Sequence, residues 1–307
     1  MKMKIISAPE FHIEEKTAVA IGKFDGIHIG HMSLLEEILS QKKSGLKAAV
    51  FTFDLSAASF FGNDSTGEIT TGEEKRQIFK RMGIDYLIEY PLNETTAHIL
   101  PEDFIERILL GMLNMKYVAA GDDLSFGYRG RGNSELLKKY AADNDFEVRI
   151  IDKVKLDGNE VSSTLVRHRI KTGDMDSAGR LLGHPYGISG TVMPGYKLGR
   201  KLGFPTMNIY PDKEKILPPN GVYYSNVIYE GSSYPGLTNI GIRPTVSDEG
   251  RISVETYLYD FDRDMYGKKI MTQLLKFKRC EEKFDSKEAL KATIDKDIEE
   301  GRAFFGI

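Results

Sequence analysis

The stretch Gly22-Lys23-Phe24-Asp25-Gly26-Ile27-His28-Ile29-Gly30-His31 decides the fold of the first half of the chain. It follows a short apolar run at 17–21 that predicts a strand, and it leads into a segment at 33–42 whose leucines and isoleucine recur at helical spacing. A glycine-containing turn between a strand and a helix presents backbone N–H groups and the positive end of the helix dipole to an anion. The stretch therefore predicts a phosphate-binding turn at the start of an α/β domain.

The alternation of short apolar runs with helical patterns continues to about Gly183. Further strands are predicted at 47–53, 86–90, 117–120 and 146–151, and further helices at 73–82, 101–113 and 135–142. Strands that alternate with helices form βαβ units, which build a parallel sheet covered by helices on both faces. Ligands of such sheets bind beyond the carboxyl ends of the strands. We therefore expect a Rossmann-like parallel α/β domain whose site includes the turn.

The second part of the chain has a different pattern. Proline and glycine become frequent after Gly183, and apolar and polar residues alternate in short segments such as 222–229 and 252–259. This texture is typical of an antiparallel barrel or sandwich. A last helix is predicted from Ser286, a suitable N-cap, to about residue 303. We therefore expect an antiparallel β-barrel with a terminal helix.

Length and composition fit two ordinary globular domains. The 307 residues suffice for two domains of about 150 residues each, predicted here as 1–184 and 185–307. Forty-two basic and 45 acidic residues give a net charge of −3, which argues against nucleic acid or an anionic membrane as a partner. The single cysteine, Cys280, and the lack of an apolar run of about 18 residues favour a cytoplasmic protein without a membrane span. The oligomeric state stays open.

The histidines of the turn add chemistry to its geometry. His28 and His31 are three residues apart at a helix start, so both rings can point the same way and donate to phosphoryl oxygens. Gly26 and Gly30 allow a nucleotide to approach the backbone closely. A glycine turn with one capping histidine is the simpler explanation of the same pattern. No G-x-x-x-x-G-K-[ST] sequence is present, and no KMSKS-like segment, which would accompany these letters in an aminoacyl-tRNA synthetase, follows.

Several further motifs follow the turn in a fixed order. They are Gly121-Asp122-Asp123-Leu124-Ser125-Phe126-Gly127, Val161-Ser162-Ser163-Thr164-Leu165-Val166-Arg167, Gly199-Arg200-Lys201-Leu202-Gly203-Phe204-Pro205-Thr206-Met207-Asn208, Gly221-Val222-Tyr223, Asn239-Ile240-Gly241-Ile242-Arg243-Pro244-Thr245 and Glu255 ahead of Asp260-Phe261. With the turn, they make the chain resemble the bacterial bifunctional riboflavin kinase/FMN adenylyltransferases, also called FAD synthetases, from about residue 20 to residue 284. The resemblance implies an enzyme that phosphorylates riboflavin to FMN with ATP and then adenylylates FMN to FAD with release of pyrophosphate.

The resemblance implies an adenylyltransferase site in the first domain. His28 and His31 would be its catalytic residues, because they bind the phosphates of ATP during the transfer. Arg167 would hold two phosphoryl oxygens in its planar fork, with a solvent-exposed helix arginine as the alternative. Asp123 fits an acidic position of the family, with a turn-forming aspartate as the alternative. The implied ATP-binding residues are Gly22, Phe24, Asp25, Gly26, His28, His31, Asp123, Ser163, Thr164 and Arg167.

The resemblance also implies a kinase site in the second domain. Thr206 and Asn208 would supply oxygen ligands to Mg²⁺, which needs few protein oxygens beside phosphate and water. Glu255 would be the general base that accepts the proton of the ribityl 5′-hydroxyl, with a solvated strand carboxylate as the alternative. Arg279 lies in a segment that resembles one near the flavin, or else forms a surface ion pair. The implied ATP-binding residues are Gly199, Gly203, Thr206, Asn208, Gly221 and Tyr223.

Two departures from the family pattern lie in the first domain. Ser56, within Leu55-Ser56-Ala57, stands where the family usually has histidine, and Leu124 replaces an aromatic residue. A serine hydroxyl donates a weaker, uncharged hydrogen bond, so we expect adenylylation to persist as the slower step. Two alternatives remain: a riboflavin kinase whose first domain has reduced or redirected activity, and a non-catalytic flavin sensor.

Overall fold

The computed structural model describes residues 2–54, 60, 62, 67–195, 203–242 and 252–307. Three parts of the motifs named above lie outside these residues: Leu55-Ser56-Ala57, Gly199-Arg200-Lys201-Leu202 and Arg243-Pro244-Thr245. The chain divides into two compact units, Met1–Ser163 and Thr164–Ile307, each of which is described by itself below. The domain boundary at residue 184 stays a prediction.

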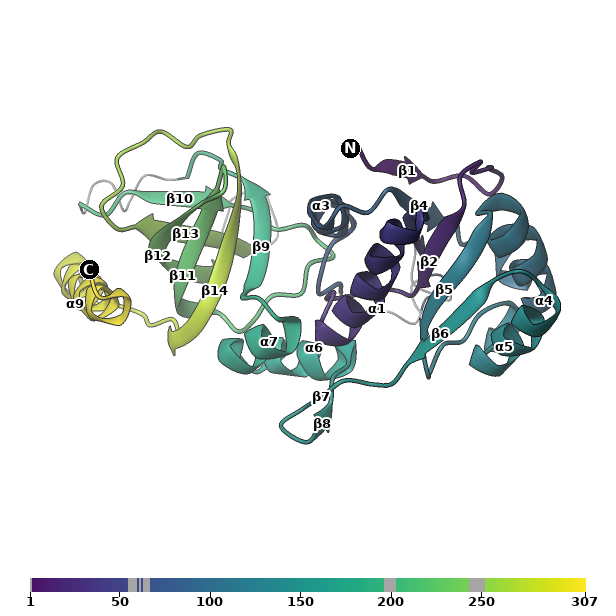
Figure 1. Ribbon diagram of the computed structural model, residues 1–307. Coiled ribbons are helices and arrows are strands. Elements are labelled where there is room, and N and C mark those ends of the chain that lie inside the picture. The colour runs from purple at the N-terminus through teal and green to yellow at the C-terminus, as the bar shows by residue number, and fades with distance from the viewer. Residues whose placement is uncertain (1, 55–59, 61, 63–66, 196–202, 243–251) are drawn as a thin grey trace. The chain divides into compact units, whose positions relative to one another are not determined.

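The first unit contains a six-stranded parallel sheet in the order β1-β4-β3-β2-β5-β6, which confirms the predicted α/β fold (Figure 1). Its strands are β1 (Lys4–Ile6), β2 (Thr17–Ile21), β3 (Lys47–Phe53), β4 (Tyr86–Tyr90), β5 (Met115–Gly121) and β6 (Glu147–Ile151). From β2 the chain builds β3 and β4 on one side and then crosses to β5 and β6 on the other. The strand order therefore reverses between β2 and β5, and a ligand of such a sheet binds beyond the carboxyl ends of these strands.

Helices cover both faces of this sheet (Figure 1). The α-helices are α1 (Ile29–Ser40), α3 (Gly72–Met82), α4 (Pro101–Asp103), continued by a π-helical segment (Phe104–Met112), and α5 (Ser134–Asp143). Alternate side chains of β2 enter opposite cores: Ala18 and Ala20 pack beneath α1 and α3, whereas Val19 and Ile21 pack beneath the π-helical segment and α5. Because both faces of β2 are buried, its sequence is one mainly apolar run without alternation.

Shorter elements complete the first unit. They are the 3₁₀ turns Gln41–Ser44, Thr96–His98 and Tyr128–Gly130 and the hairpin of β7 (Lys155–Leu156) and β8 (Asn159–Glu160). The turn at 22–31 leads directly into α1, and α3 begins with a capping box in which Thr71 and Glu74 exchange hydrogen bonds. Side chains thus fix both helix starts, since His28 caps α1 and Thr71 caps α3.

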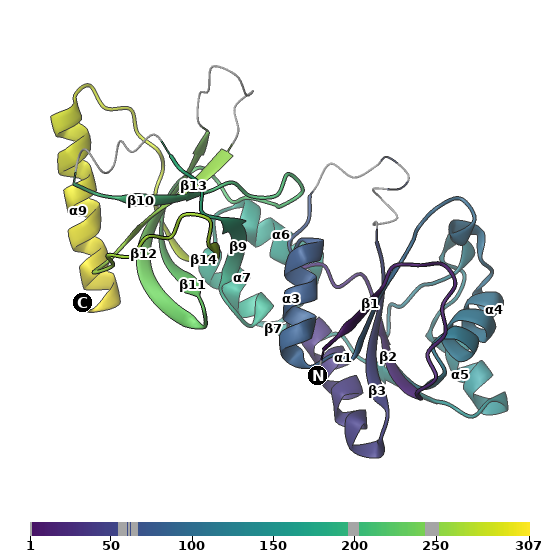
Figure 2. The same cartoon turned by 90° about the horizontal axis from the view of Figure 1, so that it is seen from above.

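The second unit consists of two helices, an antiparallel sheet and a terminal helix (Figures 1 and 2). Its elements are α6 (Ser163–Lys171), α7 (Met175–Leu182), β9 (Tyr186–Thr191), β10 (Thr206–Ile209), β11 (Gly221–Tyr229), β12 (Ser232–Ile242), β13 (Ile252–Leu258), β14 (Lys269–Arg279) and α9 (Lys287–Phe305). The strand order is β10-β13-β12-β11-β14-β9. The two edge strands, β9 and β10, approach each other just after the end of β9, where the Met193 amide donates to the Asn208 carbonyl at 2.8 Å. The sheet therefore curls into the predicted barrel.

Helix α9 packs against one side of the barrel (Figure 2). The hydroxyl of Ser286 caps it by accepting from the Ala289 amide at 3.1 Å. The Tyr224 ring of β11 stacks on Phe304 with centroids 4.3 Å apart. The contact is close, because a Cβ on Gly301 would lie 1.9 Å from the hydroxyl oxygen of Tyr259. Glycine at 301 therefore allows the helix to reach the strands.

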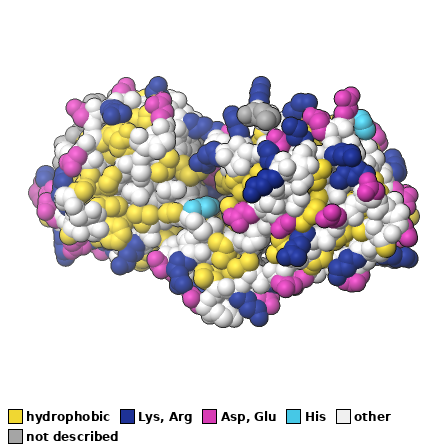
Figure 3. Space-filling model, in the orientation of Figure 1, with side chains coloured by type: hydrophobic (Ala, Val, Ile, Leu, Met, Phe, Trp, Pro, Cys, Tyr) yellow, Lys and Arg dark blue, Asp and Glu magenta, His cyan; other side chains and the backbone are white. Residues whose placement is uncertain are grey.

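The surface is mixed in charge. Figure 3 shows Lys and Arg side chains interspersed with Asp and Glu on the face drawn, with apolar side chains between them. Among the described residues no helix is long and apolar enough to cross a membrane.

Candidate active sites

The turn after β2 is held in an unusual backbone conformation by burial. The Gly22 amide donates to the Phe51 carbonyl of β3 at 3.1 Å, which continues the sheet by one residue. Phe24 and Ile27 then adopt positive φ angles of 50° and 43°, and Gly26 adopts 90°. Positive φ is strained for an apolar residue, and it persists only where the surroundings impose it. Both apolar side chains are fully buried, so the core imposes the shape of the turn.

Asp25 fixes the turn to the rest of the unit. Its carboxylate accepts from the Ile69 amide at 2.8 Å and from the Thr70 amide at 3.3 Å, just before α3. Its carbonyl accepts from the hydroxyl of Ser163 at 2.7 Å. Sequence reasoning placed Asp25 and Ser163 at the site without showing these contacts, which join the turn to two distant segments of the chain.

His28 and His31 form a stacked pair at the start of α1. Their ring centroids are 3.8 Å apart and the ring planes differ by 13°. His28 is the N-cap, and its Nδ1 accepts from the His31 amide at 3.3 Å, which leaves the proton of a neutral ring on Nε2 as a donor. The Nδ1 atom of His31 is buried and has no hydrogen-bond partner among the described residues. The two rings lie side by side as predicted, and the Nε2–H of His28 is left as a hydrogen-bond donor.

Burial makes both rings poor bases. Desolvation lowers the pKa of His28 from 6.5 to about 4, although the nearby charges of Asp25 and Asp123 act in the opposite direction. Desolvation also lowers the pKa of His31, and the charges of His28 and Lys75 lower it further. Both rings are therefore neutral at pH 7 in the unliganded protein. They offer N–H donors and the helix dipole, rather than fixed positive charge, to a phosphate.

The lowered pKa of His28 predicts a pH-dependent stability. The unfolded chain binds more protons than the folded chain between pH 6.5 and about 4, so stability is complete above pH 6.5 and falls as the pH falls through this window. The loss from His28 alone reaches about 3 kcal/mol in the free energy of unfolding. Urea titrations at pH 7.5 and pH 5, followed by far-ultraviolet circular dichroism, measure it.

His28→Asn is the matched control for this prediction, because asparagine keeps the N-cap but does not titrate. We expect the unfolding free energy of the variant to depend less steeply on pH than that of the parent chain. Equal pH dependence in both proteins contradicts the assignment of the effect to His28.

Asp123 follows β5, which lies beside β2 in the sheet, and the turn follows β2. Its carboxylate is 69% exposed and lies 3.5 Å from the Lys153 ammonium group, which also contacts Glu160 at 3.4 Å. Gly121 gives it room, because a Cβ there would lie 3.0 Å from the Asp123 Oδ1. Asp123 thus lies exposed in the turn closed by the Leu124 amide and the Gly121 carbonyl, and its charge acts on His28.

Two glycines of the turn lie beside its aromatic rings. A Cβ on Gly22 would lie 3.2 Å from the Phe24 ring, and one on Gly30 would lie 3.3 Å from the His28 ring. Glycine at 22 and 30 therefore leaves the two rings in place. Thr164 and Arg167 lie at the start of α6, in the second unit, and their contribution to nucleotide binding stays a prediction.

A third feature of the first unit is an aromatic cavity, called here the Tyr128 cavity. Its volume is about 450 Å³ and its lining includes Phe53, Tyr90, His98, Phe104, Phe126 and Tyr128. These residues lie at the ends of β3 and β4 or follow β4 and β5, so the cavity opens at the carboxyl edge of the sheet. The turn at 22–31 lies at the same edge. The His98 and Tyr128 rings stack at 4.8 Å. Sequence reasoning missed this cavity, since its members come from separate loops.

In the second unit, Glu255 lies in a row of polar residues across three strands. It is paired with Asn208 of β10 on one side and with Asn239 of β12 on the other, so the three side chains share one face of the sheet. Glu255 lines a cavity of 340 Å³, called here the Glu255 cavity. Most of its wall is apolar, and its lining includes Phe204, Thr206, Val222, Tyr257, Arg279 and Ile294.

A second cavity, called here the Asn208 cavity, adjoins the first at Thr206. Its volume is 410 Å³, and its lining includes Gly195, Pro205, Thr206, Asn208, Asp262 and Arg263. Asn208 is buried, and a Cβ on Gly195 would lie 2.4 Å from its amide nitrogen. Thr206 lines both cavities. The structure therefore places both predicted metal ligands and the predicted base where two cavities meet.

The other predicted kinase residues that the structure describes are Gly221, Tyr223 and Gly203. Gly221 has φ 152° and a Cβ there would lie 2.4 Å from the Arg279 carbonyl, so glycine permits this close approach. Tyr223 is fully buried, donates to the Pro219 carbonyl, and has its pKa raised by burial. Gly203 has φ 93°, and no atom of the described part of the chain lies within 4 Å of where its Cβ would be. The exposed backbone at Gly203 suits a ligand contact, whereas Tyr223 positions the segment around Pro219.

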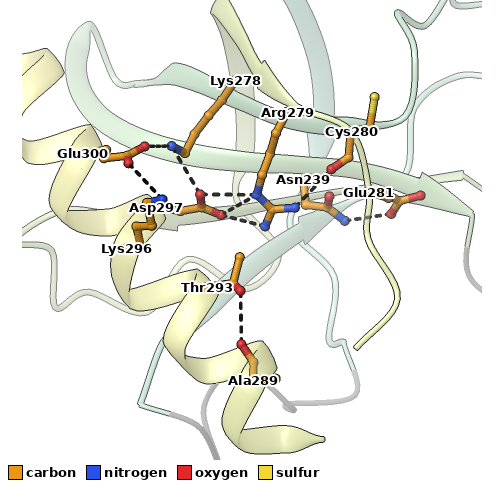
Figure 4. A network of polar contacts seen from close by, with 10 residues as sticks. All are labelled: Asn239, Lys278, Arg279, Cys280, Glu281, Ala289, Thr293, Lys296, Asp297 and Glu300. Carbon is orange, nitrogen blue, oxygen red and sulfur yellow. Dashed lines mark hydrogen bonds and ion pairs between the residues drawn. The ribbon is translucent and has the colours of Figure 1, made fainter. Parts of the chain in front are cut away.

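Arg279 forms a buried ion pair with Asp297 (Figure 4). It also lines the Glu255 cavity. Its Nε and Nη2 donate to Oδ2 of Asp297 at 2.9 and 2.6 Å, and the Asp297 side chain is 5% exposed. Sequence reasoning gave these roles as alternatives and did not identify Asp297. The position of Asp297 on the inward face of a helix is the signal that could have identified it, because a carboxylate there needs a partner.

Comparisons with known proteins match both parts of the chain. A family model described as FAD synthetase matches residues 10–165, and one described as riboflavin kinase matches residues 182–305. The chain is 36% identical over 292 residues to the bifunctional riboflavin kinase/FMN adenylyltransferase of Listeria monocytogenes, covering 94% of this chain and 92% of that protein. It is 33% identical to the protein of the same name from Bacillus subtilis, covering 99% and 98%.

A solved structure titled macrolide-efflux protein, from Streptococcus pneumoniae, is also similar. It has a TM-score of 0.87 and 29% sequence identity, and the match covers 98% of this chain and 99% of that one. The two family models together account for most of the chain, and the relatives match it over nearly their whole length. The chain therefore belongs to the family of bifunctional riboflavin kinase/FMN adenylyltransferases.

Proposed function

We propose that the first unit adenylylates FMN at the histidine turn and that the second unit phosphorylates riboflavin where its two cavities meet. The chain is a transferase with both activities: it converts riboflavin and ATP to FMN and ADP, and FMN and ATP to FAD and pyrophosphate. The observation that carries the assignment is the presence of two separate sets of phosphate-transfer groups, His28 with His31 and Thr206 with Glu255.

In the adenylyl transfer, a phosphate oxygen of FMN attacks the α-phosphorus of ATP and pyrophosphate leaves. Negative charge builds on the α-phosphoryl oxygens and on the leaving group. The Nε2–H of His28, a donor from His31 and the N-terminus of α1 would stabilise this charge. The remaining predicted ATP-binding residues, Thr164 and Arg167 included, would supply further donors, with the fork of Arg167 suited to two phosphoryl oxygens.

The Tyr128 cavity fits the isoalloxazine ring of FMN. It is large enough for a tricyclic ring, it is lined by aromatic residues that can stack on one, and it opens at the same sheet edge as the turn. FMN bound there would direct its phosphate toward the carboxyl ends of β2 and β5. The histidine turn lies at the end of β2.

In the kinase reaction, the Glu255 cavity would bind the flavin ring and the Asn208 cavity would bind ATP. The first is mainly apolar, and the second carries amide, hydroxyl and charged groups. Thr206 lies at their junction, so the ribityl 5′-hydroxyl and the γ-phosphate would meet beside it. Glu255 would accept the hydroxyl proton as the oxygen attacks phosphorus and ADP leaves.

The donor set at this junction fits Mg²⁺. The hydroxyl of Thr206 and the side-chain amide oxygen of Asn208 are hard ligands, and two protein oxygens are enough when phosphate and water complete the shell. When bound, Mg²⁺ would neutralise charge on the ATP phosphates. Thr206 and Asn208 would then orient the nucleotide toward Glu255.

Thr206→Val tests the metal assignment, because valine keeps the shape and removes the oxygen. We expect riboflavin phosphorylation to fall by about ten- to a hundredfold and to require more Mg²⁺, by analogy with loss of a group that orients the metal site. FMN adenylylation should stay unchanged. Initial rates over a Mg²⁺ titration measure both effects.

Thr293→Val is the matched control in the same unit, since its hydroxyl only donates to the Ala289 carbonyl of α9 at 3.1 Å (Figure 4). A similar loss in both variants, or an unchanged Mg²⁺ requirement in Thr206→Val, contradicts a metal role for Thr206.

The decisive assay for the whole assignment is chromatographic. The chain incubated with riboflavin, ATP and Mg²⁺ should form FMN and then FAD, and FMN supplied directly should give FAD. The kinase-only alternative predicts FMN without FAD, and the sensor alternative predicts neither product. We also expect the enzyme to act in the cytoplasm, where ATP and a reducing environment are available, which suits a chain with one cysteine.

A further inference from the structure

A second helix, α3, reaches the histidine turn from the side of His31. Helices α1 and α3 share the core on one face of the parallel sheet (Figure 2). In this core the Phe24 ring contacts the His31 ring, with centroids 5.2 Å apart, and the Phe79 ring of α3, with centroids 5.6 Å apart. Lys75 precedes Phe79 by four residues, so the two side chains lie on one face of α3. The face of α3 that carries Lys75 is therefore turned toward His31.

The start of α3 is fixed relative to the turn. The Asp25 carboxylate accepts from the amides of Ile69 and Thr70, which directly precede the N-cap Thr71. The Lys75 amide in turn donates to the Thr71 carbonyl at 2.8 Å. The backbone at Lys75 is thus held in place beside the turn before any ligand arrives.

The ammonium group of Lys75 is nearly buried and has donors left. The side chain is 13% exposed, and its Nζ donates to the Glu68 carboxylate at 3.3 Å. An ammonium group carries three N–H donors, and within the described part of the chain no other residue accepts from this one. Burial of an ammonium group is costly unless anions surround it. Lys75 is therefore suited to bind an anion that is not part of the protein.

The charges near the two histidines have opposite signs. The negative charges of Asp25 and Asp123 raise the pKa of His28, whereas the positive charge of Lys75 lowers the pKa of His31. The Nδ1 atom of His31 is also buried without a hydrogen-bond partner among the described residues. A triphosphate bound at the two rings is attracted to the side of Lys75 and repelled from the side of Asp123. This polarity directs the β- and γ-phosphates toward α3.

A cation at this place supplies what the histidines lack. Both rings are neutral at pH 7 and offer hydrogen bonds without fixed positive charge. In the transfer, a phosphate oxygen of FMN forms a bond to the α-phosphorus and the bond from that phosphorus to the bridging oxygen breaks. Pyrophosphate leaves with the bonding electrons and gains negative charge. A charged donor stabilises this charge more strongly than a neutral one.

We propose that Lys75 is a further catalytic residue of FMN adenylylation, whose ammonium group binds the β- and γ-phosphates of ATP and stabilises the pyrophosphate that leaves. Glu68 holds the ammonium group in the free protein, and the phosphates take its place when ATP binds. This inference rests on the assignment of adenylyl transfer to the histidine turn. It adds α3 to the elements that act on the nucleotide.

The reverse reaction, in which FAD and pyrophosphate give ATP and FMN, tests this contact separately from the rest of the nucleotide. Lys75→Gln in the full chain removes the charge and keeps most of the length. We expect the KM for pyrophosphate to rise about ten- to a hundredfold, as for loss of a charge-assisted hydrogen bond, and the KM for FAD to stay within about twofold. Lys75→Arg keeps a cation and should recover part of the loss.

Lys80→Gln is the matched control, because it makes the same change at an exposed lysine of α3. Its KM for pyrophosphate should equal that of the parent chain. Circular dichroism and unchanged riboflavin phosphorylation establish that each variant is folded, and Lys75→Met, which keeps the apolar stem, replaces Lys75→Gln if the latter does not fold. An equal rise in Lys80→Gln, or a rise in the KM for FAD as large as that for pyrophosphate, overturns the proposal.

Glu68→Gln separates phosphate binding from a structural ion pair. It removes the carboxylate that contacts Lys75 and leaves the ammonium group in place. We expect its KM for pyrophosphate to fall or to stay within about twofold of the parent value. A rise equal to that in Lys75→Gln overturns the proposal, because the ion pair itself would then be what the site requires.

The outcome is separable from the function proposed above. If His31→Ala leaves FMN adenylylation intact, the adenylylation site itself is misassigned and the inference fails with it. If His31→Ala lowers adenylylation while Lys75→Gln leaves the KM for pyrophosphate unchanged, only the role of Lys75 is wrong.

Discussion

Glu255→Gln should lower riboflavin phosphorylation by about 10² to 10⁴, the range for loss of a general base. The amide has the size of the carboxylate but cannot accept the hydroxyl proton. Its position in β13 between Asn208 and Asn239, and its place in the wall of the cavity, should be unaffected. The loss should therefore appear in kcat, with little change in the KM for riboflavin or ATP. Initial rates of FMN formation measure it.

FMN adenylylation by the same preparation is the internal control, and Glu288→Gln, in the first turn of α9 and exposed, is the control for charge. Both should behave as in the parent chain. Phosphorylation at the parental rate in Glu255→Gln would make Glu255 a strand carboxylate with no catalytic role.

His31→Ala should lower FMN adenylylation at least a hundredfold, and riboflavin phosphorylation should barely change. Removal of one donor to a developing oxyanion costs about 3 to 4 kcal/mol in activation free energy. Because the ring is neutral in the free protein, the loss reflects a missing hydrogen bond and not a missing charge. His31→Gln restores an N–H group on a shorter side chain, so we expect it to recover part of the rate. Chromatographic separation of FMN and FAD measures both reactions.

His12→Ala is the matched control, since His12 is an exposed histidine of the same unit. It should leave both activities unchanged. An equal loss of adenylylation and phosphorylation in folded His31→Ala contradicts the division into two sites.

The sequence predicted the elements that local patterns determine. The buried run of β2, the turn and the start of α1 follow from apolar periodicity and glycine, and their order predicted the parallel sheet. The motifs also predicted Thr206, Asn208 and Glu255, and the structure brings these residues to one junction. Apolar periodicity and motifs of this kind involve residues only a few positions apart, so they can be recognised in the sequence itself.

Contacts between residues far apart in the chain could not be predicted from the sequence. Asp25 contacts Ile69 and Ser163, which are 44 and 138 positions away, and nothing near Asp25 indicates these partners. Lys278 is an extra residue in β14, because Val222 of β11 pairs with Arg279 while Tyr223 pairs with Phe277. This bulge depends on the register between the two strands, which alternation in β14 alone does not determine. The choice between ion pair and flavin contact for Arg279 was likewise left open by the sequence, because its ion-pair partner Asp297 lies 18 positions further along the chain.

Helix α9 has a consequence for how this enzyme can be cut or fused. Ile294, Asp297 and Ile298 form part of the wall of the Glu255 cavity, although every strand of the barrel precedes them in the chain. A protein shortened before α9 would keep the whole sheet and lose one side of the binding chamber. The contact at Gly301 leaves no room for even a methyl group, so a bulky graft inside the helix would lift it away from the barrel. Insertions for engineering belong in the exposed β7–β8 hairpin, not in this helix.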